Sequence, residues 1–335
     1  MTKTPATRPT ATRADVARHA GVSSAVVSYV VNNGPRPVAP ATRERVLAAI
    51  AALGYRPNAA ARALRLGSAE MIGLVIPDNR NPFINELAHA VEVAAAARGH
   101  VMVLANSDGS AAIEEAQLRN LAARQVDGLL LISVGATVDP AALASLEVPV
   151  VLLDRGSGTE GFGSVGTDLY AGAVAGVEHL LGHGHQNIGL AIGVASDGRL
   201  DGRERGFRDA LAAASLPPGP VVRAAFTRDG GYRAGRQLLA GGRPTAVFAS
   251  SDMQAVGMLH AFHEAGVRVP DDIAVVSFDG SPEAEFCWPP LTTLAQPVAA
   301  MAEAAVDALL GGPSAEPRHH AFDAQLVIRR SCGCA

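Results

Sequence analysis

Apolar residues follow two rhythms along this chain, helical spacing near the amino terminus and short continuous runs further on. Between Thr12 and Asn33, two short amphipathic segments lie on either side of Gly21. Valines and alanines recur in both at three- and four-residue spacing, so each segment would bury one face as a helix. Thr12 and Asp15 predict a capping box on the first helix, and Ser23 predicts the N-cap of the second. The pattern is typical of a helix-turn-helix, whose second helix enters the DNA major groove.

The second of these helices, predicted from Ser24 to Asn32, offers a candidate surface for reading DNA. The residues predicted to face inward on the two helices are Val16, Ala17, Ala20, Val27, Val30 and Val31. The residues left on the outer face of the second helix are Ser24, Ala25, Ser28 and Tyr29. We predict that these four face the groove, where side chains read base edges. The alternative is an ordinary helical hairpin inside another kind of domain.

A Pro-rich stretch and a third helical pattern follow. Thr42 is the expected cap of this helix and Gly54 its stop. Its predicted core residues are Val46, Leu47, Ile50 and Leu53. The next segment, from Arg56 to Ser68, is Ala-rich and opens with Pro57 near a first helical position. It does not exceed the roughly 12 to 15 residues that an isolated helix needs to be marginally stable in water. We therefore expect this segment to be helical only when another surface orders it.

The rest of the chain alternates between strand and helix patterns. Short apolar runs bounded by turn residues predict strands at 71–77, 100–106, 128–134, 149–154, 187–193, 245–250 and 273–279. Because these runs are continuously apolar, we expect both faces of each strand to be covered, as in parallel sheets. The order predicts two doubly wound α/β halves, at about 71–166 and 167–294.

Several predicted strands end in polar residues, which matters because ligands of parallel sheets bind beyond the carboxyl ends of the strands. These residues are Asp78, Asn79, Asp154, Arg155, Asp252 and Asp279. Carboxylates at such ends suit the recognition of ligand hydroxyl groups. The alternative is that each Asp merely caps the helix that follows it.

Charge is divided unevenly between the two parts of the chain. Residues 1–67 hold ten basic side chains against two acidic ones, a net charge of +8, so the remainder must carry −12 to reach the total of −4. A basic amino-terminal module on an acidic body is expected of a DNA-binding head, because phosphate neutralisation with counterion release supplies sequence-independent affinity. A solvated basic face without a partner is the alternative.

Length and composition narrow the class of protein further. A chain of 335 residues exceeds one ordinary core and suggests two or three units. No segment has the unbroken apolar length of a membrane span, and the first residues lack the hydrophobic region of a secretory signal, so we expect a cytoplasmic protein. Residues 1–11, rich in Thr and Pro, are predicted to be disordered.

Several runs of this sequence resemble a known protein family. The runs DVARHAGVS, VSYVVNN and ATRERVLAAIAALGYRPNAAARAL are similar to the headpiece and hinge of the LacI/GalR family of bacterial transcription regulators. The effector-binding core of that family is similar to four later runs, MIGLVIPDNRNPF, PTAVFASSDMQAVGML, VPDDIAVVSFDG and PPLTTLAQP. The resemblance covers the chain from about Thr12 to about Ser331.

The resemblance implies a three-helix helix-turn-helix headpiece at 12–56 and a hinge helix and linker at 57–69. It implies two doubly wound parallel-sheet subdomains of periplasmic-binding-protein type, at 70–166 plus 295–325 and at 167–294 plus 326–335. It further implies a homodimeric repressor, not an enzyme, that binds a palindromic operator without a cofactor. A sugar-like effector between the subdomains would control DNA binding by ordering or disordering the hinge, most simply as an inducer.

The resemblance also assigns residues to these roles. The DNA-binding set is Thr12, Ser23, Ser24, Ala25, Ser28, Tyr29, Asn32, Asn58, Ala61, Arg62, Leu64 and Arg65, with Leu64 as a wedge in the minor groove. The effector-binding set is Asn79, Phe83, Asp154, Arg203, Phe226, Asp252 and Asp279. One departure concerns Tyr29, which stands where family members often carry an Arg for guanine; Ser24 and Ala25 are also smaller than usual. DNA shape and the hinge would then carry more of the specificity.

Other chemistries have less support in the sequence. Paired acids could suggest a glycosidase, but no nucleophile with an activating base is recognisable. His183 and His185 are expected in a surface turn, Cys287 is expected to be inert, and Cys332 and Cys334 are expected to be free thiols, so no metal site is predicted. Metal binding or a redox response of the Cys332 and Cys334 tail is the alternative. A cytoplasmic sugar sensor that has lost DNA specificity is the alternative to a repressor.

Overall fold

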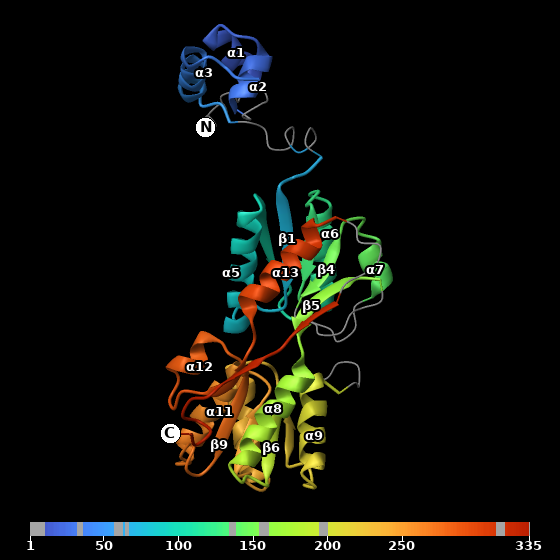
Figure 1. Cartoon of the computed structure of the whole chain (residues 1–335), viewed down its shortest axis with the longest axis vertical. Coiled ribbons are helices and arrows are strands. Elements are labelled where there is room, and N and C mark those ends of the chain that lie inside the picture. The colour runs from blue at the N-terminus through green and yellow to red at the C-terminus, as the bar shows by residue number, and fades with distance from the viewer. Residues whose placement is uncertain are drawn as a thin grey trace, which may run out of the picture. The chain divides into compact units, whose positions relative to one another are not determined.

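The computed structural model describes residues 11–31, 36–56, 63, 67–133, 139–153, 161–193, 200–312 and 319–334. The chain separates into two compact units, residues 1–69 and residues 70–335. Figure 1 shows both units. Among the described residues, no helix is both long and apolar enough to cross a membrane.

In the described part of the first unit, three helices surround a small apolar core. They are α1 (Arg13–Ala20), α2 (Ser24–Val31) and α3 (Pro40–Leu53). The buried residues are all valine or alanine: Val16, Ala17, Ala20, Val27, Val30, Val46 and Ala49. Side chains of this size let short helices approach closely, but they bury little area each. The predicted inward faces of α1 and α2 are confirmed, except that Val31 is only partly buried.

The caps of these helices follow local sequence signals. The predicted capping box is present: the Asp15 backbone N–H donates to Thr12 Oγ1 at 3.3 Å, and the Thr12 N–H donates to Asp15 Oδ2 at 2.9 Å. Gly21 and Gly54 end α1 and α3 with φ of 64° and 60°, the left-handed conformation that glycine adopts without strain.

Two predictions for α3 are wrong. The helix begins at Pro40 rather than at Thr42, because proline at a first helical position supplies a start without a side-chain cap. Leu47 is 48% exposed. With the helix in place, Val46, Ala49, Ile50 and Leu53 share the inward face and Leu47 lies about 100° away from Val46 around the axis.

The described strands of the second unit form two six-stranded sheets, each covered by helices (Figure 1). The first sheet has the order β11-β5-β4-β3-β1-β2 and is parallel throughout. Its strands are β1 (Met71–Ile76), β2 (Val101–Asn106), β3 (Gly128–Leu131), β4 (Val150–Leu153), β5 (Gly163–Thr167) and β11 (His319–Phe322). Helices α5 (Pro82–Ala97) and α13 (Val298–Leu310) pack on one face, and α6 (Ala111–Ala122) and α7 (Pro140–Ala144) on the other.

The second sheet repeats this plan with the order β12-β10-β9-β8-β6-β7. Its strands are β6 (Ile188–Ile192), β7 (Val221–Arg223), β8 (Ala246–Ala249), β9 (Ala274–Asp279), β10 (Thr292–Ala295) and β12 (Gln325–Val327), of which only β12 is antiparallel to its neighbour. Helices α8 (Leu169–Gly182) and α9 (Gly202–Ala213) cover one face, and α10 (Arg228–Ala240) and α11 (Asp252–Glu264) the other. The short helix α12 (Pro282–Phe286) follows β9. The predicted α/β class with two doubly wound parallel-sheet halves is confirmed.

The end of the chain crosses between the halves twice. After β10 in the second sheet, α13 packs into the core of the first half and β11 pairs with β5. The chain then returns, and β12 pairs with β10. We call the half built on the first sheet the N half and the half built on the second sheet the C half.

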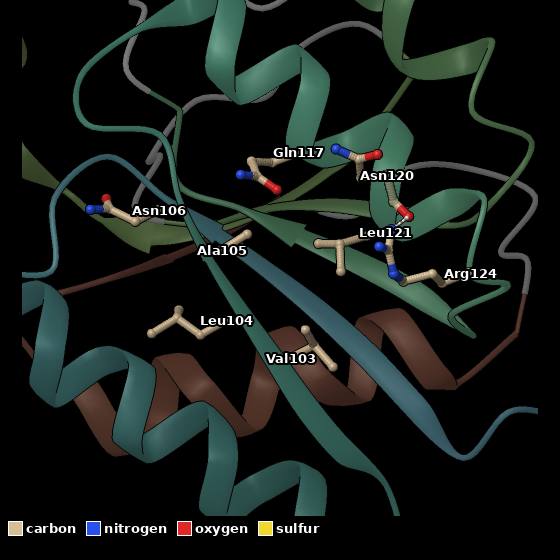
Figure 2. Close-up of a pocket in the computed structure, with 8 residues that line it drawn as sticks. All are labelled: Val103, Leu104, Ala105, Asn106, Gln117, Asn120, Leu121 and Arg124. Carbon is tan, nitrogen blue, oxygen red and sulfur yellow. Dashed lines mark hydrogen bonds between the residues drawn. The ribbon is translucent and has the colours of Figure 1, made fainter. Parts of the chain in front are cut away.

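One expectation about the strands is wrong. Continuous apolar sequence predicts that both faces of β2 are covered, yet Val101 is 65% and Leu104 is 42% exposed. The reason is that β2 is the edge strand of its sheet, with β1 on one side only. β2 and α6 line a depression of about 370 Å³ with residues such as Leu104, Gln117 and Arg124. Figure 2 shows how these side chains lie.

Candidate DNA-binding and effector sites

The helix α2 carries the predicted groove-reading face. Ser24, Ala25, Ser28 and Tyr29 all lie on this helix; Ala25 is exposed and the other three are partly exposed. Ser23 precedes the helix, and its Oγ accepts a long hydrogen bond of 3.4 Å from the Val26 N–H. Thr12 is engaged in its cap, where its hydroxyl donates to Asp15 Oδ2 at 2.6 Å. The hydrogen bond from Thr12 lowers the pKa of the Asp15 carboxyl.

Six of the predicted DNA-binding residues lie outside the described residues. They are Asn32, Asn58, Ala61, Arg62, Leu64 and Arg65.

In the C half, Arg203 is held at the start of α9 by a set of fixed contacts. Its Nε and Nη2 donate to the two carboxylate oxygens of Asp201, both at 2.9 Å, and its Nη1 donates to the Ser250 carbonyl at 2.8 Å. The Arg203 guanidinium also lies 5.2 Å from the ring centre of Phe226 and 5.7 Å from that of Phe278. Burial by itself would raise the pKa of Asp201, but the charge and hydrogen bonds of Arg203 outweigh it and hold the pKa below its usual value.

Phe226 lies above the end of β6. Its ring is 38% exposed and occupies the space that a Cβ on Gly193 would need. The Phe226 ring is therefore seated between the glycine backbone and Arg203, with part of its surface accessible.

Asp252 is the centre of a buried hydrogen-bond network. Its Oδ1 accepts from Ser277 Oγ at 2.6 Å and from Thr293 Oγ1 at 2.8 Å. Its Oδ2 accepts from the Ser281 N–H at 2.7 Å and from Ser281 Oγ at 2.9 Å. Burial raises the pKa of this carboxyl although these hydrogen bonds favour its charged form.

A carboxylate offers about four lone-pair sites, and protein donors fill this number on Asp252. The side chain is 1% exposed. This arrangement indicates a structural role for Asp252, joining β9, β10 and the loop before α12, in place of the direct effector contact expected from the sequence.

Asp279, the last residue of β9, has an unusual backbone conformation. Its φ of 121° lies in a region that residues with side chains rarely adopt, and such strain is frequent at functional sites. Gln296 Nε2 donates to Asp279 Oδ1 at 3.1 Å, and the Gln296 N–H donates to the Asp279 carbonyl at 3.0 Å.

Gln296 is a candidate that the sequence analysis missed. Its side-chain oxygen Oε1 is buried and has no hydrogen-bond partner among the described residues. A buried acceptor without a partner is costly unless a ligand or water satisfies it. The signal available in the sequence was its position in the PPLTTLAQP run, just before the chain crosses to the N half.

Of the predicted effector residues, those in the N half make fewer of the observed contacts. Asn79 lies in the turn after β1, and Phe83, in the first turn of α5, is 3% exposed and packs in the core of its half. Asp154 lies outside the described residues. In the C half, by contrast, the Arg203 guanidinium lies against the rings of Phe226 and Phe278. Phe278 is the residue before Asp279. The depression in Figure 2 contains none of the predicted effector residues.

Comparisons with known proteins agree with this organisation. Residues 12–58 match the family described as bacterial regulatory proteins, lacI family, and residues 177–332 match a periplasmic binding protein-like domain. The chain is 34% identical over 329 residues to the HTH-type transcriptional repressor PurR of Photobacterium profundum, covering 96% of this chain and 98% of that protein. It is 35% identical over 332 residues to PurR of Yersinia pestis (strain Pestoides F), covering 96% of each.

Solved structures extend the similarity to the fold. The transcriptional regulator CelR in complex with cellobiose matches with a TM-score of 0.70 at 34% identity, over 97% of this chain and all of that one. The lac repressor dimer bound to operator and the anti-inducer ONPF matches with a TM-score of 0.84 at 29% identity, over 96% of this chain and 99% of that one. Because the likeness to these repressors runs through headpiece and core alike, the chain belongs to the LacI family of bacterial regulatory proteins and is a DNA-binding transcriptional repressor, not an enzyme.

Proposed function

We propose that this repressor binds a palindromic operator as a homodimer, with α2 in the major groove of each half-site and the hinge in the central minor groove. The observation that carries the proposal is the headpiece itself: three described helices around one apolar core that leave Ala25 exposed and Ser24, Ser28 and Tyr29 partly exposed on one helix. The net charge of +8 over residues 1–67, ten basic against two acidic side chains, supports contact with phosphates. The related lac repressor was solved as a dimer on its operator. An operator-bound repressor acts where the chromosome is, so the proposal includes a cytoplasmic location.

Fluorescence anisotropy with duplexes from its own promoter region tests the DNA-binding proposal. A specific palindrome should bind about 10³-fold or more tightly than a random duplex at the same salt concentration. Leu64→Ala should weaken specific binding about 10-fold or more, because an apolar wedge sustains the kink in the DNA. Leu47→Ala is the matched control: it removes an exposed leucine from α3 and should leave affinity unchanged. Equal effects of the two substitutions would refute the wedge.

The proposed domain division follows the sheets to within one residue at each boundary. The headpiece occupies 12–56 and the hinge 57–69; the N-subdomain takes 70–166 plus 295–325 and the C-subdomain 167–294 plus 326–335. Support comes from the pairing of β11 with β5 and of β12 with β10.

The proposed effector is a small polyhydroxylated molecule, sugar-like in its hydrogen-bonding groups, which binds at the carboxyl ends of the strands. Arg203, Phe226 and Asp279 form its C-half contacts, Asn79, Phe83 and Asp154 its N-half contacts, and Gln296 contributes from the connection between the halves. The partly exposed Phe226 ring offers an apolar face, and the unpartnered Gln296 Oε1 offers an acceptor for a ligand hydroxyl. Two relatives were solved with sugars, CelR with cellobiose and an Enterococcus faecium regulator with ribose. The latter has a TM-score of 0.70 at 29% identity, over 78% of this chain and 98% of that one.

An effector bound at these residues would act as an inducer, because it would disorder the hinge and so weaken DNA binding. A thermal-shift screen of sugars, with nucleosides as the second ligand class, tests the effector, because a ligand that binds only the folded form raises the melting temperature. Arg203→Gln should abolish the shift that a true effector produces. Arg205→Gln, on the same helix but beside Tyr170, should preserve it. A nucleoside hit would overturn the sugar assignment, and loss in both variants would overturn the role of Arg203.

The proposed dimer face runs along both halves. Phe286 and Trp288 of the C half are 84% and 81% exposed, and Val101 and Leu104 are exposed on the edge strand β2 of the N half. Exposed apolar groups of this size are typical of surfaces that pair with another chain. Trp288→Lys should shift the protein toward monomer in analytical ultracentrifugation, whereas a monomeric wild type would refute the dimer.

A further inference from the structure

The carboxyl-terminal segment brings two cysteines to two histidines of α8. His179, His183, Cys332 and Cys334 offer ligand atoms that all lie within 4.8 Å of one another. Cys334 Sγ lies 3.2 Å from His183 Nε2 and 3.8 Å from His179 Nε2. The sequence suggested unrelated roles for the HGHQ turn and for the thiol tail, because about 150 residues separate them.

These separations suit one tetrahedral metal ion. With Zn–S bonds of about 2.3 Å and Zn–N bonds of about 2.0 to 2.1 Å, tetrahedral ligand atoms stand about 3.3 to 3.8 Å apart. The two distances from Cys334 fall at or close to this range. Small side-chain rotations would bring the widest pair into it. Two sulfurs and two imidazole nitrogens are a ligand set that favours zinc over hard cations such as Mg²⁺ or Ca²⁺.

The backbone on both sides of the cluster is fixed independently of any metal. His179 and His183 are one helical turn apart at the end of α8, which matches the H-x3-H spacing of zinc sites. In the tail, Ser331 Oγ donates to the Val275 carbonyl at 2.6 Å and accepts from the Thr292 N–H at 2.8 Å. The tail is therefore anchored to β9 and β10 immediately before Cys332.

One residue separates the two cysteines, whereas zinc-binding cysteine pairs usually have about two to four residues between them. Gly333 accounts for the difference, since its φ of 93° turns the chain as few other residues could. This turn returns Cys334 toward the histidines that Cys332 already faces. Cys332 is buried, and Thr292 Oγ1 donates a hydrogen bond to its sulfur at 3.0 Å, the kind of outer contact that orients a thiolate ligand.

The returning segment follows α8 along its length. At the start of the helix, the Asp168 N–H donates to the Phe322 carbonyl at 2.8 Å. One turn on, a Cβ on Gly172 would lie 3.3 Å from Ala324 Cβ. At the far end of the helix lie Cys332 and Cys334. A metal at the cluster would fasten the last part of the segment that crosses between the two halves.

We propose that His179, His183, Cys332 and Cys334 bind one structural Zn²⁺ that clips the carboxyl-terminal segment to α8. Four protein ligands leave no open coordination position, so the ion serves stability and not chemistry. The thiols lose their protons on binding, so zinc uptake releases protons to solvent.

Metal analysis of the full-length protein, with matched variants, tests this site. Protein purified without chelator should contain zinc at one equivalent per chain by mass spectrometric metal analysis. Chelator-treated protein titrated with Co²⁺ should develop the visible bands of tetrahedral cobalt and a thiolate charge-transfer band. Zinc should raise the melting temperature of the chelator-treated protein.

Each ligand variant is paired with a control variant of the same residue type outside the cluster. Cys334→Ser and His183→Asn should each lower metal affinity by more than the roughly 10- to 100-fold typical of lost outer-shell partners. Cys287→Ser and His185→Asn should bind as the wild type does, since neither residue belongs to the cluster. Absence of cobalt bands in the wild type, or equal losses in ligand and control variants, would overturn the site. The site would also be overturned if Cys332 and Cys334 formed a disulfide that persists in reducing buffer.

Discussion

The two halves of the core share a plan but differ in what they bury. Among the described residues, the N half buries four polar or charged side chains and the C half eleven, with Gln296 on the connection between them. The four in the N half are Ser107, Glu114, Ser164 and Thr167. Three of those in the C half, Ser277, Ser281 and Thr293, donate hydrogen bonds to a fourth, Asp252.

Glycine contacts show the same difference. A Cβ on Gly257 of α11 would meet the backbone carbonyl of Arg228, so α10 and α11 touch main chain to main chain. In the N half, a Cβ on Gly73 would lie 2.6 Å from Leu129 Cδ2, the flexible end of a side chain. Hydrogen bonds and backbone contacts are directional, whereas apolar packing is not. The C half is thus held together by more directional contacts than the N half.

The largest effect expected of this difference is at Asp252. Asp252→Ala would remove an acceptor from four donors and leave the Ser281 N–H buried without a partner. Hydrogen bonds to charged groups contribute about 1.5–3 kcal/mol each and are not additive, so we expect a loss of at least about 3 kcal/mol. Calorimetry should show the core transition lowered by about 6–12 °C. Asp252→Asn, which keeps one acceptor and the volume, should lose less; an Asp252→Ala protein as stable as wild type would show that the network is not a support.

Asp252 also shows where prediction from the sequence stops. Local signals sufficed for the Thr12 and Asp15 capping box and for the seven apolar strands, because periodicity and caps depend on neighbours. An Asp after a strand looks the same whether it binds a ligand or the protein. Its partners Ser277, Ser281 and Thr293 stand 25 to 41 residues away in the chain, so only the fold shows that they meet.

The elements and site residues that were missed have related causes. Strands β5, β7 and β10 read GSVGT, VVR and TTLA, too short or too polar to stand out. Gln296 was missed because its significance is a buried oxygen without a partner, a property of packing. The histidine and cysteine cluster depends on a chain crossing that no local pattern encodes.

The next largest effect concerns the contact of α10 with α11. Gly257→Ala must push the Arg228 backbone away, and overpacking of this kind costs typically about 1–3 kcal/mol. Gly73→Ala in the N half should cost less, because the added methyl group meets the ends of the Leu129 and Leu121 side chains, which can give way more easily than a backbone carbonyl. Melting temperatures of the two variants measure the difference. Equal losses would mean that the N half is packed as rigidly as the C half.

A smaller effect should appear in the pH dependence of stability. The pKa of Asp201 is held below its usual value in the folded protein, so its contribution is present at neutral pH and is lost as pH falls through that lowered pKa. The melting temperatures of wild type and Asp201→Asn should therefore differ at pH 7 and converge toward pH 3. In the N half, a hydrogen bond from Arg80 lowers the pKa of Asp78 in the same way, but Arg80 is 74% exposed. Solvent screens that pair, so Asp78→Asn should change the melting temperature less and more salt-dependently.

The smallest effect is expected at Ser107, a fully buried polar residue of the N half. Its Oγ donates a hydrogen bond to the Ile76 carbonyl at 3.1 Å, next to the end of β1. Ser107→Ala removes the donor together with its need for a partner, and the carbonyl keeps the Ser107 N–H as a donor at 2.9 Å. We expect a loss of about 1 kcal/mol or less, a shift of about 2–4 °C. If Ser107→Ala lowers the melting temperature as far as Asp252→Ala does, the number of buried polar groups does not separate the halves energetically. A small shift would instead locate the polar stabilisation of the core in the C half.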